Sequence, residues 1–259
     1  MIRLPLHRLR PQLPLTLPIL AAATAVAVWW LAVAAFDIAP LFLPSPAAVA
    51  SAFATAPGPL LRETGATAAV TLAGFALAGI SAVVLGAVLA ACRTVERAVL
   101  PLLIGGNAIP KVSLAPLLVV WLGFGPQPRI VMVAAICFFP ILLSTMAGLR
   151  TPTELAELAR SLTASRWRTF TKIRFPWALP QIFTGLKTAI TLAVIGAVVA
   201  EIASPNAGLG AVIVAAGASA DTAQAFAAIT LLALLSTALF YLLHGLERML
   251  LRWARDTST

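Results

Sequence analysis

Long apolar runs separated by short polar turns make up most of the chain. Six of the runs are long enough to cross a bilayer, which takes about 20 residues as a helix, and they lie at about 13–36, 64–91, 99–122, 130–149, 177–203 and 223–243. Two more apolar pieces, 47–54 and 211–216, are too short to cross, and they predict an interfacial helix and a half-helix or surface segment. The pattern therefore predicts an all-α integral membrane protein with about six transmembrane helices.

The first run has two interpretations. Arginines precede it and Ala32-Val33-Ala34 resembles a cleavage site, as in a secretory signal. However, the run exceeds the core of about 7 to 15 residues that is typical of a signal. It also contains Trp29 and Trp30, a pair suited to the membrane interface. We therefore expect an uncleaved first transmembrane helix.

Small residues recur at every fourth position of the second run: Gly74, Ala78, Ala82, Gly86 and Ala90. Such a seam would let a neighbouring helix approach closely, because lipid provides no hydrophobic drive for helix association. The alternative is simply an alanine-rich helix, since alanine is common throughout the chain. The third run contains several prolines and a pair of glycines, so we expect it to be interrupted.

Composition agrees with a membrane protein and excludes an ordinary soluble domain. Of the 259 residues, 61% are hydrophobic and 10% are charged, whereas about a quarter of the residues in soluble proteins are charged. The formal net charge of +9 would favour nucleic acid in a soluble protein, but in membrane proteins Lys and Arg gather on cytoplasmic loops. With six crossings, 14 of the 18 Lys and Arg fall on the side of both termini, which predicts that both termini are cytoplasmic.

Residues suited to enzymatic chemistry are sparse. Cys92 and Cys137 lack the spacing of metal ligands, and the two histidines lie at opposite ends of the chain. The fragment closest to a phosphate-binding loop, 185–188, lacks the upstream glycine. We therefore expect a non-catalytic protein that binds no metal or cofactor of its own.

The longest polar stretch, 150–176, lies between the fourth and fifth runs. Read as a helix, 153–170 is amphipathic. Its apolar face consists of Leu155, Leu158, Ala159 and Leu162. Glu154, Glu157 and Arg160 lie on the polar side, with the acidic residues in the first turns, where the helix dipole favours them. Such a helix either docks onto a partner outside the membrane or lies on the lipid surface, and amphipathicity alone leaves both open.

Motifs in and after this stretch resemble a known family. The segment Glu157-Leu158-Ala159-Arg160-Ser161-Leu162-Thr163-Ala164-Ser165, followed by Phe175-Pro176-Trp177-Ala178-Leu179-Pro180, resembles the cytoplasmic coupling motif of permease subunits in binding-protein-dependent ABC importers. Other motifs resemble the branch that serves nitrate, sulfonate, taurine, bicarbonate and pyrimidine or riboflavin-type solutes. They include Ala108-Ile109-Pro110-Lys111, Trp121-Leu122-Gly123-Phe124-Gly125, and Ala200-Glu201 with Gly208-Leu209-Gly210. The chain departs from the family motif at Leu158, Thr163 and Phe175, where the family has Ala, Gly and Leu.

This resemblance implies the type I ABC importer permease fold in a bacterial inner (plasma) membrane. It implies that a second copy of the chain completes the pore, that cytoplasmic ATPase subunits bind ATP and Mg, and that a periplasmic or lipid-anchored protein delivers the solute. It also implies that the amphipathic helix is a coupling helix, seated in a groove of the ATPase. The residues that it assigns to ATPase coupling are Glu154, Leu155, Glu157, Leu158, Ala159, Arg160, Leu162, Thr163 and Ala164.

Four polar residues in the predicted spans are candidates for the translocation pathway: Asn107, Lys111, Lys187 and Glu201. An ionisable group in a membrane is costly unless it is paired or hydrated, so each has a functional and a structural interpretation. In the functional one, the lysines attract an anionic solute. In the structural one, Lys111 caps carbonyls freed by the proline breaks, Lys187 pairs across a dimer, and Glu201 contacts the delivery protein or closes the gate.

These features predict three parts of the chain and one function. The parts are 1–61, with the tail, the first helix and an external proline-rich loop; 62–253, the permease core with its coupling loop 150–176; and 254–259, a cytoplasmic tail. The predicted function is the permease subunit of an ATP-driven importer that moves a small solute into the cytoplasm. The solute is either an anion of nitrate, sulfonate or taurine type or a heterocycle of pyrimidine or riboflavin type. A self-contained secondary transporter or channel is the alternative.

Overall fold

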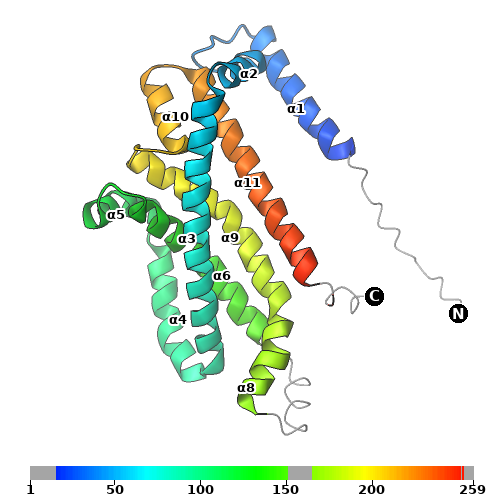
Figure 1. Cartoon of the computed structure of the whole chain (residues 1–259), viewed down its shortest axis with the longest axis vertical. Helices are drawn as coiled ribbons and strands as arrows, with labels where there is room; N and C mark the ends of the chain where they lie inside the picture. Colours follow the sequence, from blue (N-terminus) through cyan, green and yellow to red (C-terminus); the bar gives the residue numbers. More distant parts are fainter. Residues whose placement is uncertain (1–15, 151–164, 252, 254–259) are drawn as a thin grey trace, which may run out of the picture.

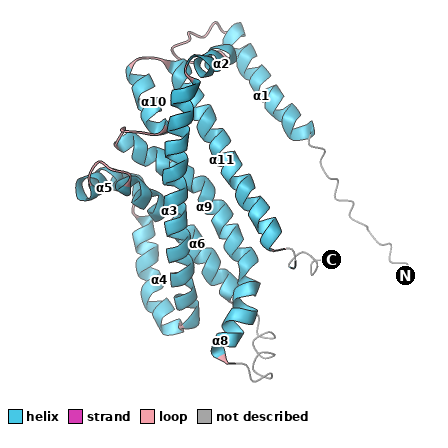
Figure 2. Cartoon of the chain, in the orientation of Figure 1, coloured by secondary structure: helices cyan, strands magenta, loops and turns pink. Residues whose placement is uncertain are grey.

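The computed structural model describes residues 16–150, 165–251 and 253, and within these ranges every regular element is helical (Figures 1 and 2). The elements are α1 (Thr16–Ala35), α2 (Pro46–Thr55), α3 (Pro57–Ala91), α4 (Arg93–Ala108), η1 (Lys111–Leu114), α5 (Ala115–Leu122), α6 (Gln127–Leu149), α8 (Arg166–Thr169), η2 (Phe170–Arg174), α9 (Phe175–Ala203), α10 (Leu209–Ala218) and α11 (Thr222–Leu250).

Four helical stretches in the described ranges are long and apolar enough to cross a membrane: α3, α6, α9 with its preceding turns, and α11. α4 with η1 and α5 is also apolar enough for a fifth crossing if the pair counts as one span, although it is bent by 80° at a break. The break contains Pro110, which has no backbone N–H to continue the helix. α1 adds a shorter apolar helix, Ile19–Ala35. The prediction of an all-α membrane protein with about six transmembrane helices is therefore confirmed.

Two helical stretches begin earlier than the hydropathy pattern indicates. α3 begins at Pro57, a residue whose fixed φ suits the first turn of a helix. α9 is joined through η2 to α8, so that helical backbone runs from Trp167 to Ala203. The difference arises because hydropathy marks only the part of a helix that lies in lipid. The two short apolar pieces form α2 and α10.

The core lies where α3, α6 and α9 pack together. It is built from small and medium apolar side chains, including the buried Ala78, Cys137 and Ala193. Close approach needs glycine: a Cβ at Gly74 would lie 2.5 Å from the Cβ of Val133. Four members of the predicted small-residue seam are buried in α3 and the fifth, Ala90, is half-buried. The seam is therefore a packing surface, as expected where contact area must come from backbone proximity.

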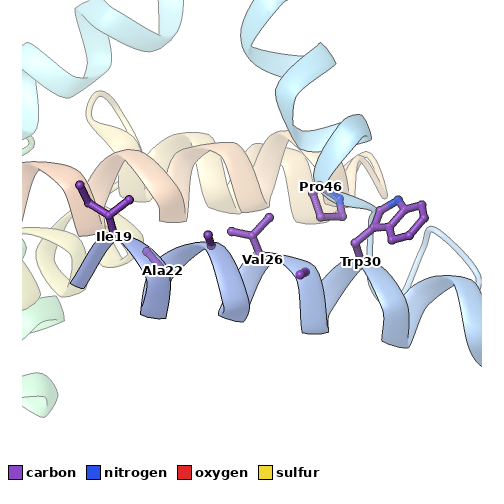
Figure 3. A pocket seen from close by; sticks show the side chains of 7 residues that line it. Ile19, Ala22, Val26, Trp30 and Pro46 are labelled. Carbon is purple, nitrogen blue, oxygen red and sulfur yellow. The ribbon is translucent and has the colours of Figure 1, made fainter. Parts of the chain in front are cut away.

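The remaining helices surround this core. α11 packs along α9 through Ile190, Val194 and Leu239. α1 stands apart from the bundle in Figure 1, and Trp29 connects it to α11, with ring centroids 5.9 Å from Phe226. One face of α1 forms an apolar groove with Pro46 of α2 (Figure 3). The side chains in the groove are suited to contact with lipid and offer no group for chemistry.

Candidate coupling and translocation sites

The residues assigned to ATPase coupling, from Glu154 to Ala164, lie outside the described residues. The base of their loop is described. At the end of α6, Arg150 donates to a carboxylate oxygen of Glu96 in the first turn of α4, with N and O 2.8 Å apart. Arg174 donates to the carbonyl of Leu149 at 3.1 Å. These bonds bring the end of α6, the start of α4 and the start of α9 together at the loop.

The backbone after the loop enters α9 without a break. η2 is a π-helix, a rare turn that is frequently found at functional sites. The aromatic rings of Trp167, Phe170 and Phe175 follow one another, with centroids 6.2 and 6.0 Å apart. Continuous helix and successive ring contacts make this segment a stiff connection from the loop to the core.

Lys111 and Asn107 lie together at the break between α4 and η1. The Lys111 ammonium donates to the Asn107 side-chain oxygen at 2.6 Å and to the Asn107 carbonyl at 3.2 Å. The last carbonyls of a helix lack intrahelical donors, so Lys111 makes the capping contact of its structural interpretation. Both residues are only half-buried, and the prediction that Lys111 lies on the translocation pathway stays a prediction.

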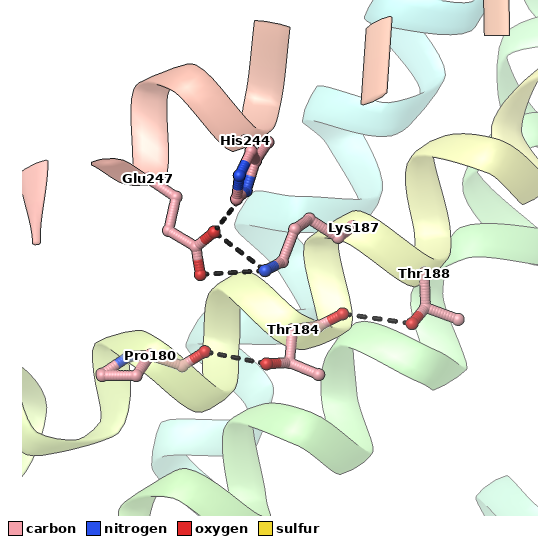
Figure 4. Close-up of polar contacts among 6 residues, drawn as sticks. All are labelled: Pro180, Thr184, Lys187, Thr188, His244 and Glu247. Atoms are coloured by element: carbon pink, nitrogen blue, oxygen red, sulfur yellow. Dashed lines mark hydrogen bonds and ion pairs between the residues drawn. The ribbon is translucent and has the colours of Figure 1, made fainter. Parts of the chain in front are cut away.

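Lys187 pairs within the chain rather than requiring a partner across a dimer. Its ammonium lies 2.8 and 3.0 Å from the two carboxylate oxygens of Glu247, and Nδ1 of His244 lies 3.2 Å from one of them (Figure 4). Glu247 and His244 belong to the last two turns of α11. Glu247 lies just after the sixth apolar run, whereas Lys187 lies within the fifth. The hydropathy pattern therefore does not indicate that the two residues form a pair.

Glu201 is fully buried at the end of α9 and holds the turn that leads into α10. Its carboxylate accepts from the Gly210 amide at 2.8 Å and from the Thr67 hydroxyl at 3.1 Å. The Thr67 hydroxyl in turn accepts from the Leu209 amide at 2.9 Å. A carboxylate at the amides of a helix N-terminus is favoured by the helix dipole. Glu201 is 0% exposed, so its carboxylate is not at the surface for contact with a delivery protein. Its other predicted role, closing the gate, stays a prediction.

Glu63 and Arg129 complete this arrangement, and sequence reasoning did not identify either of them, nor Thr67. Glu63 accepts from the Gly208 amide at 2.6 Å, and the buried Arg129 donates to the Ala207 carbonyl at 2.9 Å. We name Glu63, Thr67, Arg129 and Glu201 the α10 clamp, since they fix the start of α10 to α3, α6 and α9. The available signal was a charged residue directly before each of two apolar runs, 64–91 and 130–149.

Gly208 is the residue that lets the clamp close. Its φ is +101°, in a region that essentially only glycine adopts when ψ is near 180°, and its ψ is 168°. A Cβ at this position would collide with the carboxylate of Glu201. The described residues contain no group of three or more His, Cys, Asp or Glu that could hold a metal ion. The contacts of the α10 clamp hold α10 to α3, α6 and α9.

Comparison with known proteins gives a family for this arrangement. A family model described as binding-protein-dependent transport system inner membrane component matches residues 82–256. The riboflavin transport system permease protein of Chloroflexus aurantiacus is 41% identical over 245 residues, which cover 93% of this chain and 89% of that protein.

Two further relatives are named for other solutes. The formylaminopyrimidine transport permease protein of Halalkalibacterium halodurans is 35% identical over 191 residues, 73% of this chain and 76% of that protein. The taurine transport system permease protein of Escherichia coli is 29% identical over 259 residues, 95% and 94% of the two chains. All three are named as permeases of transport systems. The chain therefore belongs to the family of binding-protein-dependent transport system inner membrane components, as the non-catalytic permease subunit of an ABC importer.

Proposed function

We propose that this permease subunit carries a heterocyclic solute of riboflavin or formylaminopyrimidine type into the cytoplasm after a solute-binding protein delivers it. The observation that carries the proposal is the order of similarity. The relative named for riboflavin is 41% identical over 93% of the chain, whereas the relative named for taurine is 29% identical over 95%. An anion of taurine or sulfonate type is the competing solute.

The energy would come from ATPase subunits that bind ATP and Mg and dock on residues 154–164. Leu155, Leu158 and Leu162 would fill a groove of the ATPase, while Glu157 and Arg160 would form hydrogen bonds at its rim. The bonded loop base and the continuous helix from Trp167 to Ala203 support this coupling. A loop held in this way passes a displacement to α9 as rigid-body movement.

A second copy of the chain would pack against α4, η1 and α5. α4 has no buried residue, although it is half of a membrane crossing. The broken backbone between Ala108 and Lys111 is tolerated at membrane depth only where protein or a water-filled cavity covers it. A second copy would cover Val120 and Trp121, which are 78% and 68% exposed. It would also place Lys111 beside a path shared by the two copies.

The proposed orientation has both termini and the coupling loop in the cytoplasm and α2 and α10 on the outer side. In Figure 1, α2 and α10 lie at one end of the bundle and α8 lies at the other. Six crossings assign 14 of the 18 Lys and Arg to the side of both termini, which supports this orientation. We keep the division into 1–61, 62–253 and 254–259 as part of the same proposal.

The function is tested by identifying what the protein binds in its native host. We would tag the full chain, extract it in mild detergent and identify the co-purifying proteins and small molecules by mass spectrometry. The expected result is an ATPase together with a solute-binding protein that retains a heterocycle. Recovery of a sulfonate instead would overturn the solute assignment. Recovery of the chain alone, with uptake in vesicles free of ATP, would identify a self-contained transporter.

Glu157→Lys tests the coupling helix. We expect the variant to lose ATP-driven uptake or to lose the ATPase during purification, because the rim contact changes from attraction to repulsion. Arg93→Glu is the matched control, since it reverses an exposed charge at the same end of the bundle but outside the loop. Normal uptake and normal ATPase recovery with Glu157→Lys would exclude the proposed docking mode.

A further inference from the structure

Lys187, Glu247 and His244 form a charged cluster where two membrane helices meet. We infer that this cluster, named here the α9–α11 tie, keeps the C-terminal end of α11 in a fixed position on α9 while the ATPase displaces the segment before α9. The inference rests on the proposed function for the source of the movement. It assigns to the three residues a positioning role that is separate from contact with the solute.

The contacts of the tie fix both distance and direction. Both carboxylate oxygens of Glu247 accept from the Lys187 ammonium, and the two side chains are only 17% and 23% exposed. The His244 ring stacks on Phe240, with centroids 6.5 Å apart and planes 14° from parallel, which holds the imidazole against the carboxylate. Removing one partner would leave a charge unpaired inside the membrane protein, a costly state.

Apolar packing alone would hold the C-terminal end of α11 weakly, because the contacts of α11 with α2 lie in its N-terminal part, where Ala227 is buried with Val49. Only 17% of its most apolar window is buried, and its packing on α9 is limited to a cluster around Ile190, Val194 and Leu239. Lipid provides no hydrophobic drive between helices. The apolar side chains between α9 and α11 therefore oppose sliding and rotation of α11 only through the fit of their packed surfaces. A hydrogen-bonded ion pair fixes the register and the rotation of α11 together.

The tie lies in a segment of α9 that has two features that favour bending. Pro180 is inside the helix and cannot donate to the carbonyl four residues earlier. The hydroxyls of Thr184 and Thr188 donate to the carbonyls of Pro180 and Thr184 at 3.0 and 3.1 Å (Figure 4), and bonds of this kind often bend helices. A bend here would change the contact between α9 and α11 unless the tie held the two helices together.

The experiment measures the distance between α9 and α11, with one spin label on each helix close to the tie. The full chain, with exposed Cys92 replaced by serine, receives spin labels at Gln181→Cys on α9 and Leu250→Cys on α11, two exposed positions. The complex with its co-purified ATPase is placed in lipid nanodiscs. Double electron–electron resonance then gives the distance distribution without nucleotide and after trapping with ATP and vanadate.

The labelled chain is diluted with unlabelled chain, so that a second copy adds no further distances. We then expect one narrow distribution that is the same in both nucleotide states. Lys187→Met should lose it and gain a second population, and the exchanged pair Lys187→Glu with Glu247→Lys should restore it. Thr188→Val is the matched control, since it removes a neighbouring hydrogen bond without touching a charge. A nucleotide-dependent distance in the unmodified tie, or two populations in a folded exchanged pair, would overturn the inference. If no ATPase co-purifies, the proposed function fails, while the nucleotide-free distributions still test the tie.

Discussion

Replacing Gly208 with alanine tests the α10 clamp at its tightest point. The backbone there, with φ +101° and ψ 168°, costs a residue with a Cβ about 1–3 kcal/mol. The new Cβ would also displace the Glu201 carboxylate from the Gly210 amide or the Thr67 hydroxyl, and a hydrogen bond to a charged group contributes about 1.5–3 kcal/mol. With one such bond lost, we expect the free energy of unfolding to fall by about 3–6 kcal/mol.

Substitutions at two other glycines measure the free-energy cost of the backbone conformation apart from the cost of the collision with Glu201. Gly123 also has a positive φ, +81°, but a Cβ there would meet no atom within 4 Å, so Gly123→Ala should cost about 1–3 kcal/mol from the backbone alone. Gly217 lies in α10 with open space around it. Gly217→Ala should therefore stabilise the protein by up to about 1 kcal/mol, because alanine favours the helix.

The assay is thermal unfolding of the purified full chain in detergent, followed by tryptophan fluorescence. At about 2–4 °C per kcal/mol, Gly208→Ala should lower the midpoint by about 6–24 °C. A midpoint no lower than that of Gly123→Ala would show that contact with Glu201 contributes nothing. The statement that the α10 clamp fixes the start of α10 through Glu201 would then be wrong.

The same assay tests the helix interface and Arg129. Gly74→Ala should lower the free energy of unfolding by about 1–3 kcal/mol through overpacking against Val133. Gly79→Ala should be neutral, because the nearest atom to its new Cβ would be 3.7 Å away. Equal unfolding midpoints for the two variants would refute the seam as a contact surface. Arg129→Gln should cost about 1–3 kcal/mol, because the Ala207 carbonyl loses its charged donor, and an unchanged midpoint would contradict this. Lys111→Gln should leave uptake of radiolabelled riboflavin unchanged if its ammonium serves only to cap α4; a loss of uptake at normal protein levels would place it in the pathway.

Hydropathy was sufficient to predict the all-α membrane fold, the order of its apolar helices and, approximately, their number. Each such helix must satisfy its own backbone and needs about 20 apolar residues, so the signal is local. The seam of α3 could also be found from sequence, because spacing by four residues places Gly74, Ala78 and Ala82 on one face. Helix ends were harder to predict, since residues outside the apolar runs continue α3 back to Pro57 and the α9 stretch back to Trp167.

The polar contacts depend on packing that no local pattern contains. Lys187 and Glu247 are 60 residues apart, and Glu63 and Gly208 are 145 apart. The cost of a charge in a membrane indicates that Lys187 and Glu201 need partners, but it does not identify them. Glu63 and Arg129 each lie directly before an apolar run, and this position marks them as charges at the membrane boundary without identifying their partners near α10. The coupling residues came from family resemblance and lie outside the described residues.

The unequal lengths of α3 and α6 determine how the protein responds to bilayer thickness. α6 has 23 residues, or about 35 Å, close to the hydrocarbon core of about 30 Å. α3 has 35 residues, or about 52 Å, and even a tilt of about 40° leaves it a height of about 40 Å. Its ends therefore extend among the lipid headgroups, where the side chain of Arg62, which is 83% exposed, is well solvated. A change in lipid chain length thus acts first on hydrophobic matching at α6, while α3 stays matched over a wide range of membranes.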